Sequence, residues 1–198
     1  MITKEPVVIC DLSDVLIKGL EGSEVAIAKE LKLPVDEVSA ILFSADYNSL
    51  WLGRVDEKDF FDELVDKLNW DIEVATLIKI IHDNFYIIPG VFEIYKQLHS
   101  CCTTILYSTN CKEWVNEMKN IINYSELFDK EYYSFTLGAH KKMEKGYRFI
   151  LDQYPEKLTY LIDDSSSNIV MAEKLGIRGL HFKDAKQLER VLIKENIL

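Results

Sequence analysis

A chain of 198 residues is long enough for one domain of generous size, or for a core with an inserted segment. Its 48% hydrophobic and 28% charged residues are the composition of an ordinary soluble globular protein. The net charge of −10 argues against a nucleic-acid partner.

The first predicted element is a strand over residues 7–10. This short apolar run leads directly into Asp11, which is typical of a buried strand in a parallel sheet. Ligands of open α/β sheets bind at the carboxyl ends of the strands, so Asp11 is expected at the mouth of a site. A turn-capping aspartate would occupy the same position, and this alternative stays open.

A helical segment follows, with apolar residues at helical spacing from Ser23 to about Tyr86. Pro34 separates its first two helices, and Asp56 is expected to cap a later one. The segment contains no convincing strand. We therefore expect a small all-helical cap over residues 19–86, inserted after the first strand and lying over its carboxyl end as a lid.

Strands and helices alternate in the rest of the chain. Strands are predicted at 103–107, 128–135, 158–162 and 179–182, and helices at 89–98, 114–122, 147–151 and 168–175, with a last helix capped by Asp184. This alternation predicts a Rossmann-like α/β fold, a parallel sheet with helices on both faces. The core would comprise residues 1–18 and 87–198.

Polar residues end four of the predicted strands, and in a parallel sheet they would converge on one rim. They are Asp11; Ser108 or Thr109; Lys141; and the pair Asp163-Asp164. Carboxylates with hydroxyl and backbone oxygens suit Mg²⁺, and a lysine beside them can hold a phosphoryl oxygen. A carboxylate can also attack a phosphoryl group to form an aspartyl phosphate.

These segments resemble the motifs of the haloacid-dehalogenase (HAD)-like hydrolase superfamily. The run ending in Asp11 is similar to the first motif, and Ser108 after its strand resembles the second. The segment 134–141 is similar to the one leading to the family's lysine, and 161–165 resembles the fourth motif. The resemblance covers nearly the whole chain, with the cap weakest. It points to the small-cap branch of sugar phosphatases such as α-glucose-1-phosphate phosphatase.

The resemblance implies a Mg²⁺-dependent phosphatase-type hydrolase of small phosphorylated metabolites. Asp11 would be the nucleophile that forms the aspartyl phosphate, and Lys141 the catalytic cation. The other implied residues are the phosphate-binding Ser108, Thr109 and Asn110, and the metal ligands Asp11, Ser13, Asp163 and Asp164.

One departure concerns Ser13, two residues after the nucleophile, where the family's phosphatases usually carry a second Asp as general acid/base. Serine cannot usefully protonate a leaving group at neutral pH, and general acid–base help contributes about 10²- to 10⁴-fold. Turnover is therefore expected to be slow. Related sugar phosphatases often have Gly there and bind the metal through the backbone carbonyl, so the missing Asp need not abolish it. Asp14 is expected to point elsewhere.

Two more departures lie in the second and third motifs. The family often has Ser or Thr followed directly by Asn, whereas Thr109 here separates Ser108 from Asn110. We prefer Ser108 as the phosphate-binding hydroxyl, with Thr109-Asn110 as the alternative register. Lys142 follows Lys141 where the family commonly has Pro, which loosens the loop and keeps the charge.

In the cap, Tyr47, Trp51 and Arg54 are candidates for substrate binding, because an arginine beside aromatic rings suits a sugar or a second anion. Core packing and surface charge explain these residues equally well. Two other functions stay open. One is a weak or inactive family member that binds a phosphorylated ligand or a protein, and the other is a metal-independent dehalogenase. The Asp163-Asp164 pair speaks against the dehalogenase.

The same sequence predicts the compartment. No apolar run reaches the ~18 residues of a membrane span, and Met1 to Pro6 lack a signal-peptide hydrophobic region. The four cysteines have no paired metal spacing. We expect reduced thiols in a cytoplasmic protein with no membrane partner, as a monomer or homodimer.

Overall fold

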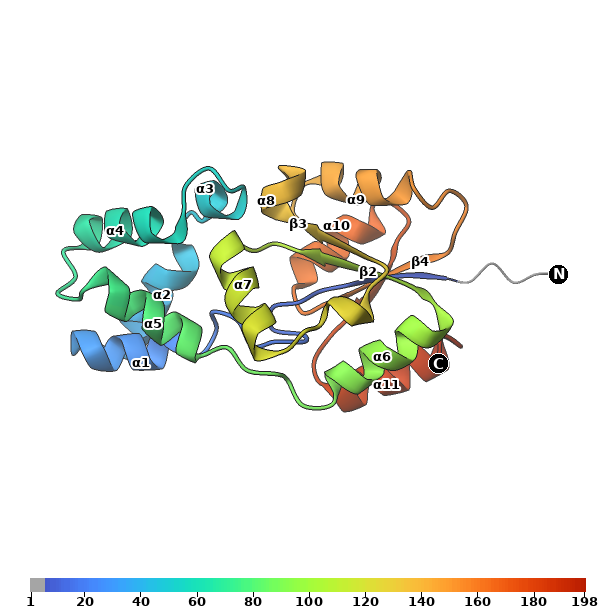
Figure 1. Cartoon of the computed structure of the whole chain (residues 1–198), viewed down its shortest axis with the longest axis horizontal. Coiled ribbons are helices and arrows are strands. Elements are labelled where there is room, and N and C mark those ends of the chain that lie inside the picture. Colours follow the sequence, from blue (N-terminus) through green and yellow to red (C-terminus); the bar gives the residue numbers. More distant parts are fainter. Residues whose placement is uncertain (1–5) are drawn as a thin grey trace.

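The structure is a computed structural model that describes residues 6–198 (Figure 1). Its centre is a parallel sheet of five strands in the order β3-β2-β1-β4-β5. The strands are β1 Val7–Cys10, β2 Thr103–Ser108, β3 Lys130–Tyr133, β4 Thr159–Asp163 and β5 Arg178–His181. The Rossmann-like fold class is confirmed, while the predictions that concern residues 1–5 lie outside the described residues.

Strand β1 is the middle of this sheet. Val7 is paired with Thr103 of β2 on one side and with Thr159 of β4 on the other. All four residues of β1 are fully buried, because apolar side chains alternate between two cores. The carboxyl end of β1 therefore opens between two neighbouring strands, which is where ligands of such sheets bind.

Helices cover both faces of the sheet (Figure 1). Residues of α9 Glu144–Leu151 and α10 Ser166–Glu173 pack with Val7 and Ile9 in one core. On the other face, α6, α7 and α11 contribute to the core around Val8 and Cys10; they span Val91–Cys101, Lys112–Ile121 and Ala185–Lys194. This two-sided burial explains why the central strand β1 is a continuous apolar run.

Five helices lie between β1 and α6 in the chain. They form one end of the molecule, and the N-terminal end of β1 points toward the other end (Figure 1). They are α1 Ser23–Leu31, α2 Val35–Ser44, α3 Asn48–Trp51, α4 Glu57–Leu68 and α5 Val74–Asp83, called here the helical insert. The side chain of Asp56 accepts the Asp59 N–H at 2.8 Å and caps α4, as predicted. Helix α3 had no recognisable signal in the sequence.

The two chain segments that join the insert to the core run side by side. Ile17 forms an antiparallel bridge with Ile87, and the N–H of Lys18 donates to the carbonyl of Tyr86 at 2.8 Å. The N–H of Ile88 donates to the carbonyl of Leu16 at 2.9 Å. These backbone pairs fix where the insert leaves the sheet.

The third strand is shorter than predicted. It ends at Tyr133, and Ser134–Leu137 turns into the short helix α8. The buried Ser134 hydroxyl donates to the carbonyl of Asn110 at 3.1 Å, and Gly138 ends the helix with φ 59°, a left-handed conformation suited to glycine. The prediction that Ser134-Phe135 continues the strand is therefore wrong.

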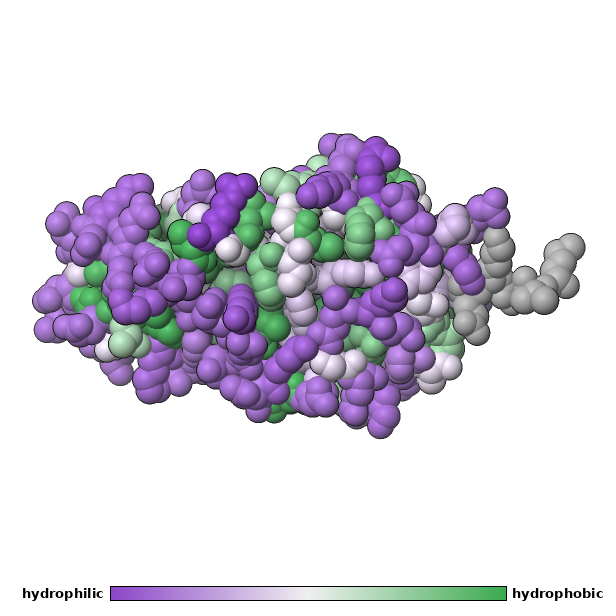
Figure 2. Space-filling view, turned by 45° about the horizontal axis from the view of Figure 1, so that its top comes forward, coloured by the Kyte–Doolittle hydropathy of each residue, from purple (hydrophilic) through white to green (hydrophobic). Residues whose placement is uncertain are grey.

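Within residues 6–198, no helix has the length and apolar character that crossing a membrane requires. The face in Figure 2 is mostly hydrophilic, and its hydrophobic residues lie in small separate areas rather than in one large patch.

Candidate active site

Asp11 is the first residue after β1 and is held on several sides. Its N–H donates to the carbonyl of Ile162 at 3.0 Å, so the pairing with β4 continues to this residue. Its carbonyl accepts the hydroxyl of Tyr95 at 3.1 Å, and its carboxylate accepts the N–H of Leu12 at 2.7 Å. The side chain is therefore fixed at the sheet rim, where only 5% of the residue is exposed.

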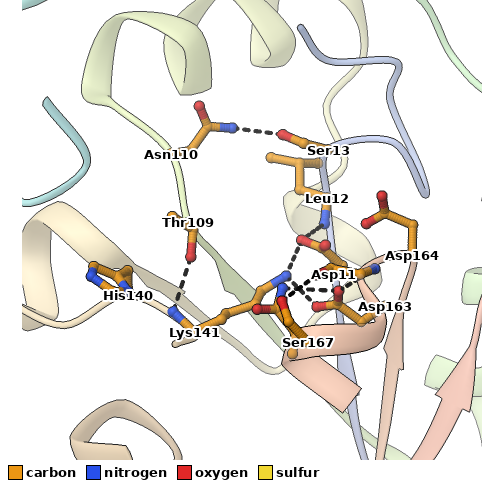
Figure 3. Close-up of polar contacts among 12 residues, drawn as sticks. Asp11, Leu12, Ser13, Thr109, Asn110, His140, Lys141, Asp163, Asp164 and Ser167 are labelled. Atoms are coloured by element: carbon orange, nitrogen blue, oxygen red, sulfur yellow. Dashed lines mark hydrogen bonds and ion pairs between the residues drawn. The ribbon is translucent and has the colours of Figure 1, made fainter. Parts of the chain in front are cut away.

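Lys141 joins two of the predicted acidic residues (Figure 3). Its Nζ forms an ion pair with Asp11 and another, at 2.7 Å, with Asp163. The lysine is 2% exposed, and its backbone N–H donates to the hydroxyl of Thr109 at 3.0 Å. Burial opposes the charged form of Lys141, but the two carboxylates win and raise its pKa above the ordinary value.

The two acidic residues at the end of β4, Asp163 and Asp164, lie in different environments. Asp163 is fully buried and accepts the Ser165 N–H at 2.9 Å and the Asn168 side-chain amide at 3.0 Å, besides its pair with Lys141. Asp164 is more exposed. Burial, with Asp163 nearby, raises the pKa of Asp164 to about 6. Burial also raises the pKa of Asp11, against the pull of Lys141.

The donor set fits a divalent cation. Asp11, Asp163 and Asp164 each offer one carboxylate oxygen, and these atoms lie within 4.8 Å of one another. Carboxylate oxygens are the ligands that Mg²⁺ prefers. One lysine offsets only one of three carboxylate charges, so a bound cation would relieve the repulsion that remains. The ligand role of Ser13 stays a prediction.

The second-motif residues take three different positions. Ser108 is fully buried, and its hydroxyl has no hydrogen-bond partner within residues 6–198. Thr109 lines a cavity at the rim. The buried Asn110 points its amide at Ser13, donating to the hydroxyl at 2.9 Å (Figure 3). The choice between Ser108 and Thr109 for phosphate binding stays a prediction.

A cavity of about 330 Å³ lies between the insert and the rim. Tyr47 and Trp51 line it from the insert, with their rings stacked at 5.0 Å. Thr109, His140 and Lys142 line it from the core. Arg54 lines a separate cavity of about 410 Å³, so the structure does not bring Trp51 and Arg54 to one site as the sequence had suggested.

A second buried carboxylate connects the insert to the core. Glu57 of α4 is 4% exposed and accepts the indole N–H of Trp114 on α7 at 2.5 Å. It also lies 2.8 Å from Nε2 of His82 on α5. We call Glu57, His82 and Trp114 the insert–core joint.

No family model matches the sequence, and no curated protein matches it. Solved structures do match the fold. A predicted HAD-like family hydrolase from Porphyromonas gingivalis has a TM-score of 0.75 at 20% identity, with 97% of this chain and 98% of that chain covered. The chain has the HAD-like fold.

Two further solved structures share this HAD-like fold. A HAD family enzyme from Bacteroides thetaiotaomicron, in complex with magnesium and inorganic phosphate, has a TM-score of 0.73 at 17% identity, with 91% of this chain and 96% of that chain covered. The L-2-haloacid dehalogenase from Xanthobacter autotrophicus has a TM-score of 0.67 at 10% identity, with 98% and 85% covered.

Within this HAD-like fold, sequence reasoning missed the cavity position of His140 and the whole insert–core joint. His140 carries a signal in retrospect, because it directly precedes the buried Lys141. Burial and the charge of Lys142 lower the pKa of His140 below its ordinary value. Glu57 and His82 had no such signal, since their spacing of 25 residues becomes a contact only when α4 packs on α5.

Proposed function

We propose that the protein is a Mg²⁺-dependent, phosphatase-type hydrolase of small phosphorylated metabolites, with Asp11 as the nucleophile. The observation that carries this proposal is the buried contact of Lys141 with Asp11 and Asp163 at the rim of the sheet, with Asp164 close by. The magnesium and phosphate complex of the enzyme from Bacteroides thetaiotaomicron, which has the same fold, supports it.

Asp11, Lys141 and the metal ligands each have a separate role in the proposed reaction. An Asp11 carboxylate oxygen attacks phosphorus, the bond to the leaving oxygen breaks, and an aspartyl phosphate forms. Lys141 balances negative charge on the phosphoryl oxygens as a point charge. Mg²⁺ held by Asp11, Asp163, Asp164 and the Ser13 backbone would supply further positive charge there. Water then hydrolyses the aspartyl phosphate and restores Asp11.

The second-motif residues are proposed to hold the phosphoryl group. A buried hydroxyl without a partner costs about 1–3 kcal/mol, and Ser108 has such a hydroxyl within the described part of the chain. A phosphoryl oxygen would supply the missing partner. Thr109 already accepts the Lys141 N–H, and Asn110 holds Ser13, which leaves Asn110 a positioning role through its side chain.

We also propose that the helical insert acts as a cap with limits near residues 19–86, on a core of residues 1–18 and 87–198. The antiparallel bridge between Ile17 and Ile87, in the two segments that join the insert to the core, supports these limits. The cavity between Trp51 and Thr109 supports a substrate position under this cap, with Trp51 as a contact. Arg54, which lines the other cavity, is a weaker candidate.

The test is phosphate release from a broad panel of phosphate esters by purified protein with Mg²⁺. The Asp11→Asn variant should lose it, because the amide is no longer a nucleophilic carboxylate. The matched control is Asp14→Asn, because Asp14 binds Lys18 at 2.8 Å and Asn tolerates its φ of 59°. Equal rates for Asp11→Asn and the unmodified protein would remove the proposal.

The same assay separates the other candidates. A binding protein of this fold would be stabilised by phosphorylated ligands but would not turn them over. The hydrogen bond from Asn110 to Ser13 favours this candidate, because it holds an alcohol at the position where the resemblance places an acid. A dehalogenase would keep its activity in EDTA. The fold shared with the L-2-haloacid dehalogenase favours that alternative, and the acidic cluster disfavours it.

A further inference from the structure

We propose that Tyr47 selects the leaving group of the substrate. Its hydroxyl would form a hydrogen bond with a hydroxyl on an uncharged, ring-shaped leaving group that lies in the cavity between the insert and the rim. This inference rests on the proposed function, because the phosphoryl site must hold the other end of the same molecule.

The hydroxyl of Tyr47 is an unused hydrogen-bonding group. Tyr47 lines the cavity of about 330 Å³, and only 8% of the residue is exposed. Its hydroxyl is buried and has no hydrogen-bond partner within residues 6–198. The hydroxyls of Ser108 and Tyr147 share this property in the described chain, but neither residue lines the cavity. Because buried hydroxyls are normally hydrogen-bonded, the one at Tyr47 calls for a partner that the chain does not supply.

The ring of Tyr47 is held by its neighbours. The ring of Trp51 stacks on it at 5.0 Å with 14° between the two planes, and the ring of Phe60 lies at 4.9 Å. Trp51 in turn packs edge-on against Trp114 of α7 at 5.2 Å. These contacts keep the Tyr47 side chain in its buried position. A partner must therefore come to the hydroxyl, and a ligand can approach it through the cavity that Tyr47 lines.

The wall around Tyr47 suits a ring. Leu20, Leu42 and Phe43 line the same cavity as the stacked rings of Tyr47 and Trp51. Apolar and aromatic side chains of this kind bind a ligand ring by removing apolar surface from water, and a few polar groups then fix its orientation. Among the buried polar atoms of this wall, the Tyr47 hydroxyl is free to take that second role.

The cavity is connected to the phosphoryl site through Thr109. This residue lines the cavity from the core, and its hydroxyl accepts the backbone N–H of Lys141 at 3.0 Å (Figure 3). The ammonium of Lys141 contacts Asp11, the proposed nucleophile. A phosphate ester bound at Asp11 would therefore extend its leaving group past Thr109 toward the insert.

A leaving group with a net charge would gain little in this cavity. The lining residues that carry a formal charge, with histidine counted as neutral, are Asp46 of the insert and Lys142 of the core. They have opposite signs, and both are exposed to water, which screens their attraction for a ligand. Arg54, the cation expected to bind a second anion, lines the separate cavity of about 410 Å³. An ion of either sign would meet a like charge, so an uncharged leaving group is favoured.

A hydroxyl on the leaving group matches Tyr47, because both groups can donate and accept a hydrogen bond. The bond would form only in the complex, so the free protein does not depend on it. Removing the Tyr47 hydroxyl should thus weaken the use of hydroxylated substrates without weakening the fold. A hydroxyl with a purely structural role would show the opposite behaviour.

The first test compares the unmodified protein with Tyr47→Phe on aryl phosphates in the presence of Mg²⁺. The substrates are phenyl phosphate, the ortho, meta and para isomers of hydroxyphenyl phosphate, and para-carboxyphenyl phosphate. For each ester, the ratio of kcat/KM between the two proteins cancels the intrinsic reactivity of the leaving group. We expect Tyr47→Phe to lose about tenfold on at least one hydroxyphenyl phosphate, the effect of one hydrogen bond, and much less on phenyl phosphate.

The second test measures the Tm of the ligand-free protein. Tyr47→Phe should not lower the Tm, because the deleted hydroxyl has no partner within the described residues. The matched control is Tyr124→Phe, since the hydroxyl of Tyr124 is buried and lies 3.3 Å from the hydroxyl of Tyr133. This control should lower the Tm by about 2–4 °C. An equal fall for Tyr47→Phe would assign its hydroxyl to the fold and overturn the inference.

Two kinetic results overturn the inference and leave the proposed function intact, provided that turnover still requires Asp11. One is an equal change of kcat/KM on all the esters in Tyr47→Phe, including no change at all. The other is a preference of the unmodified protein for the carboxyphenyl ester over every hydroxyphenyl ester. Absence of turnover of every ester by the unmodified protein removes the proposed function, and the inference with it.

Discussion

Asp11 and Glu57 are both buried carboxylates with a basic side chain beside them, yet they lie in opposite kinds of surroundings. Asp11 sits with two more carboxylates around one lysine. Glu57 lies with an indole N–H and an imidazole, to which its carboxylate is hydrogen-bonded. The first cluster has excess negative charge, which suits cation binding and chemistry, while the second is a hydrogen-bonded connection between α4, α5 and α7.

This difference has a physical consequence that burial alone does not reveal. A buried carboxylate whose oxygens accept hydrogen bonds contributes to the stability of the fold. A buried cluster of several carboxylates is stable only when cations are bound beside it. Substitutions at the rim should therefore respond to Mg²⁺, and substitutions at the insert–core joint should not.

The largest effect is expected for Lys141→Met, which removes the ammonium that contacts Asp11 and Asp163. Breaking a buried ion pair on one side costs about 3–5 kcal/mol of the free energy of unfolding. Urea unfolding without metal measures it, and Mg²⁺ should restore part of the loss. The control is Lys142→Met, since Lys142 is exposed next to it. An equal loss in both variants would contradict a special role for the buried lysine.

Mg²⁺ itself should stabilise the unmodified protein by about 2.7 kcal/mol at a hundredfold excess over its Kd. Asp164→Asn should reduce this gain, and Asp14→Asn should not. Because the pKa of Asp164 is raised to about 6, its carboxyl gains a proton as the pH falls through about 6. That proton stabilises the metal-free form and competes with the metal, so the Mg²⁺ effect on Tm should be full above this pH and fade below it.

A smaller effect that Mg²⁺ does not reverse is expected for Glu57→Ala. The indole N–H of Trp114 and the ring of His82 would lose their buried acceptor, at a cost of about 1–3 kcal/mol. Glu57→Gln keeps one acceptor oxygen and should lose less. Asp66→Ala, an exposed acid on the same helix, is the control. Recovery of Glu57→Ala by Mg²⁺ would mean that the joint and the rim are one coupled unit.

The two regions also differ in how far the sequence predicted them. Asp11 directly follows the buried strand β1 and Asp163 ends the buried strand β4, so their convergence follows from parallel topology, which places all carboxyl strand ends on one rim. Lys141 comes after β3 and the short helix α8, on the same side of the sheet. The contact between Glu57 and Trp114 spans 57 residues and depends on how the insert rests on α7, which no local pattern encodes. Asp14 was expected to point elsewhere, and its left-handed backbone explains why.

The smallest effect concerns Asp56, the residue beside Glu57. Its side chain caps α4 by accepting the Asp59 N–H at 2.8 Å, and it is exposed. Asp56→Ala should cost about 1 kcal/mol, and Asp56→Asn much less, because asparagine also caps helices. Combining Asp56→Ala with Glu57→Gln tests whether the cap and the joint are independent. Additive losses, within about 0.5 kcal/mol, would mean that the contact with Trp114 holds the first turn of α4 without the cap. A combined loss well above the sum would mean that the helix end unwinds once both contacts weaken, so that Glu57 reaches Trp114 only from a capped helix.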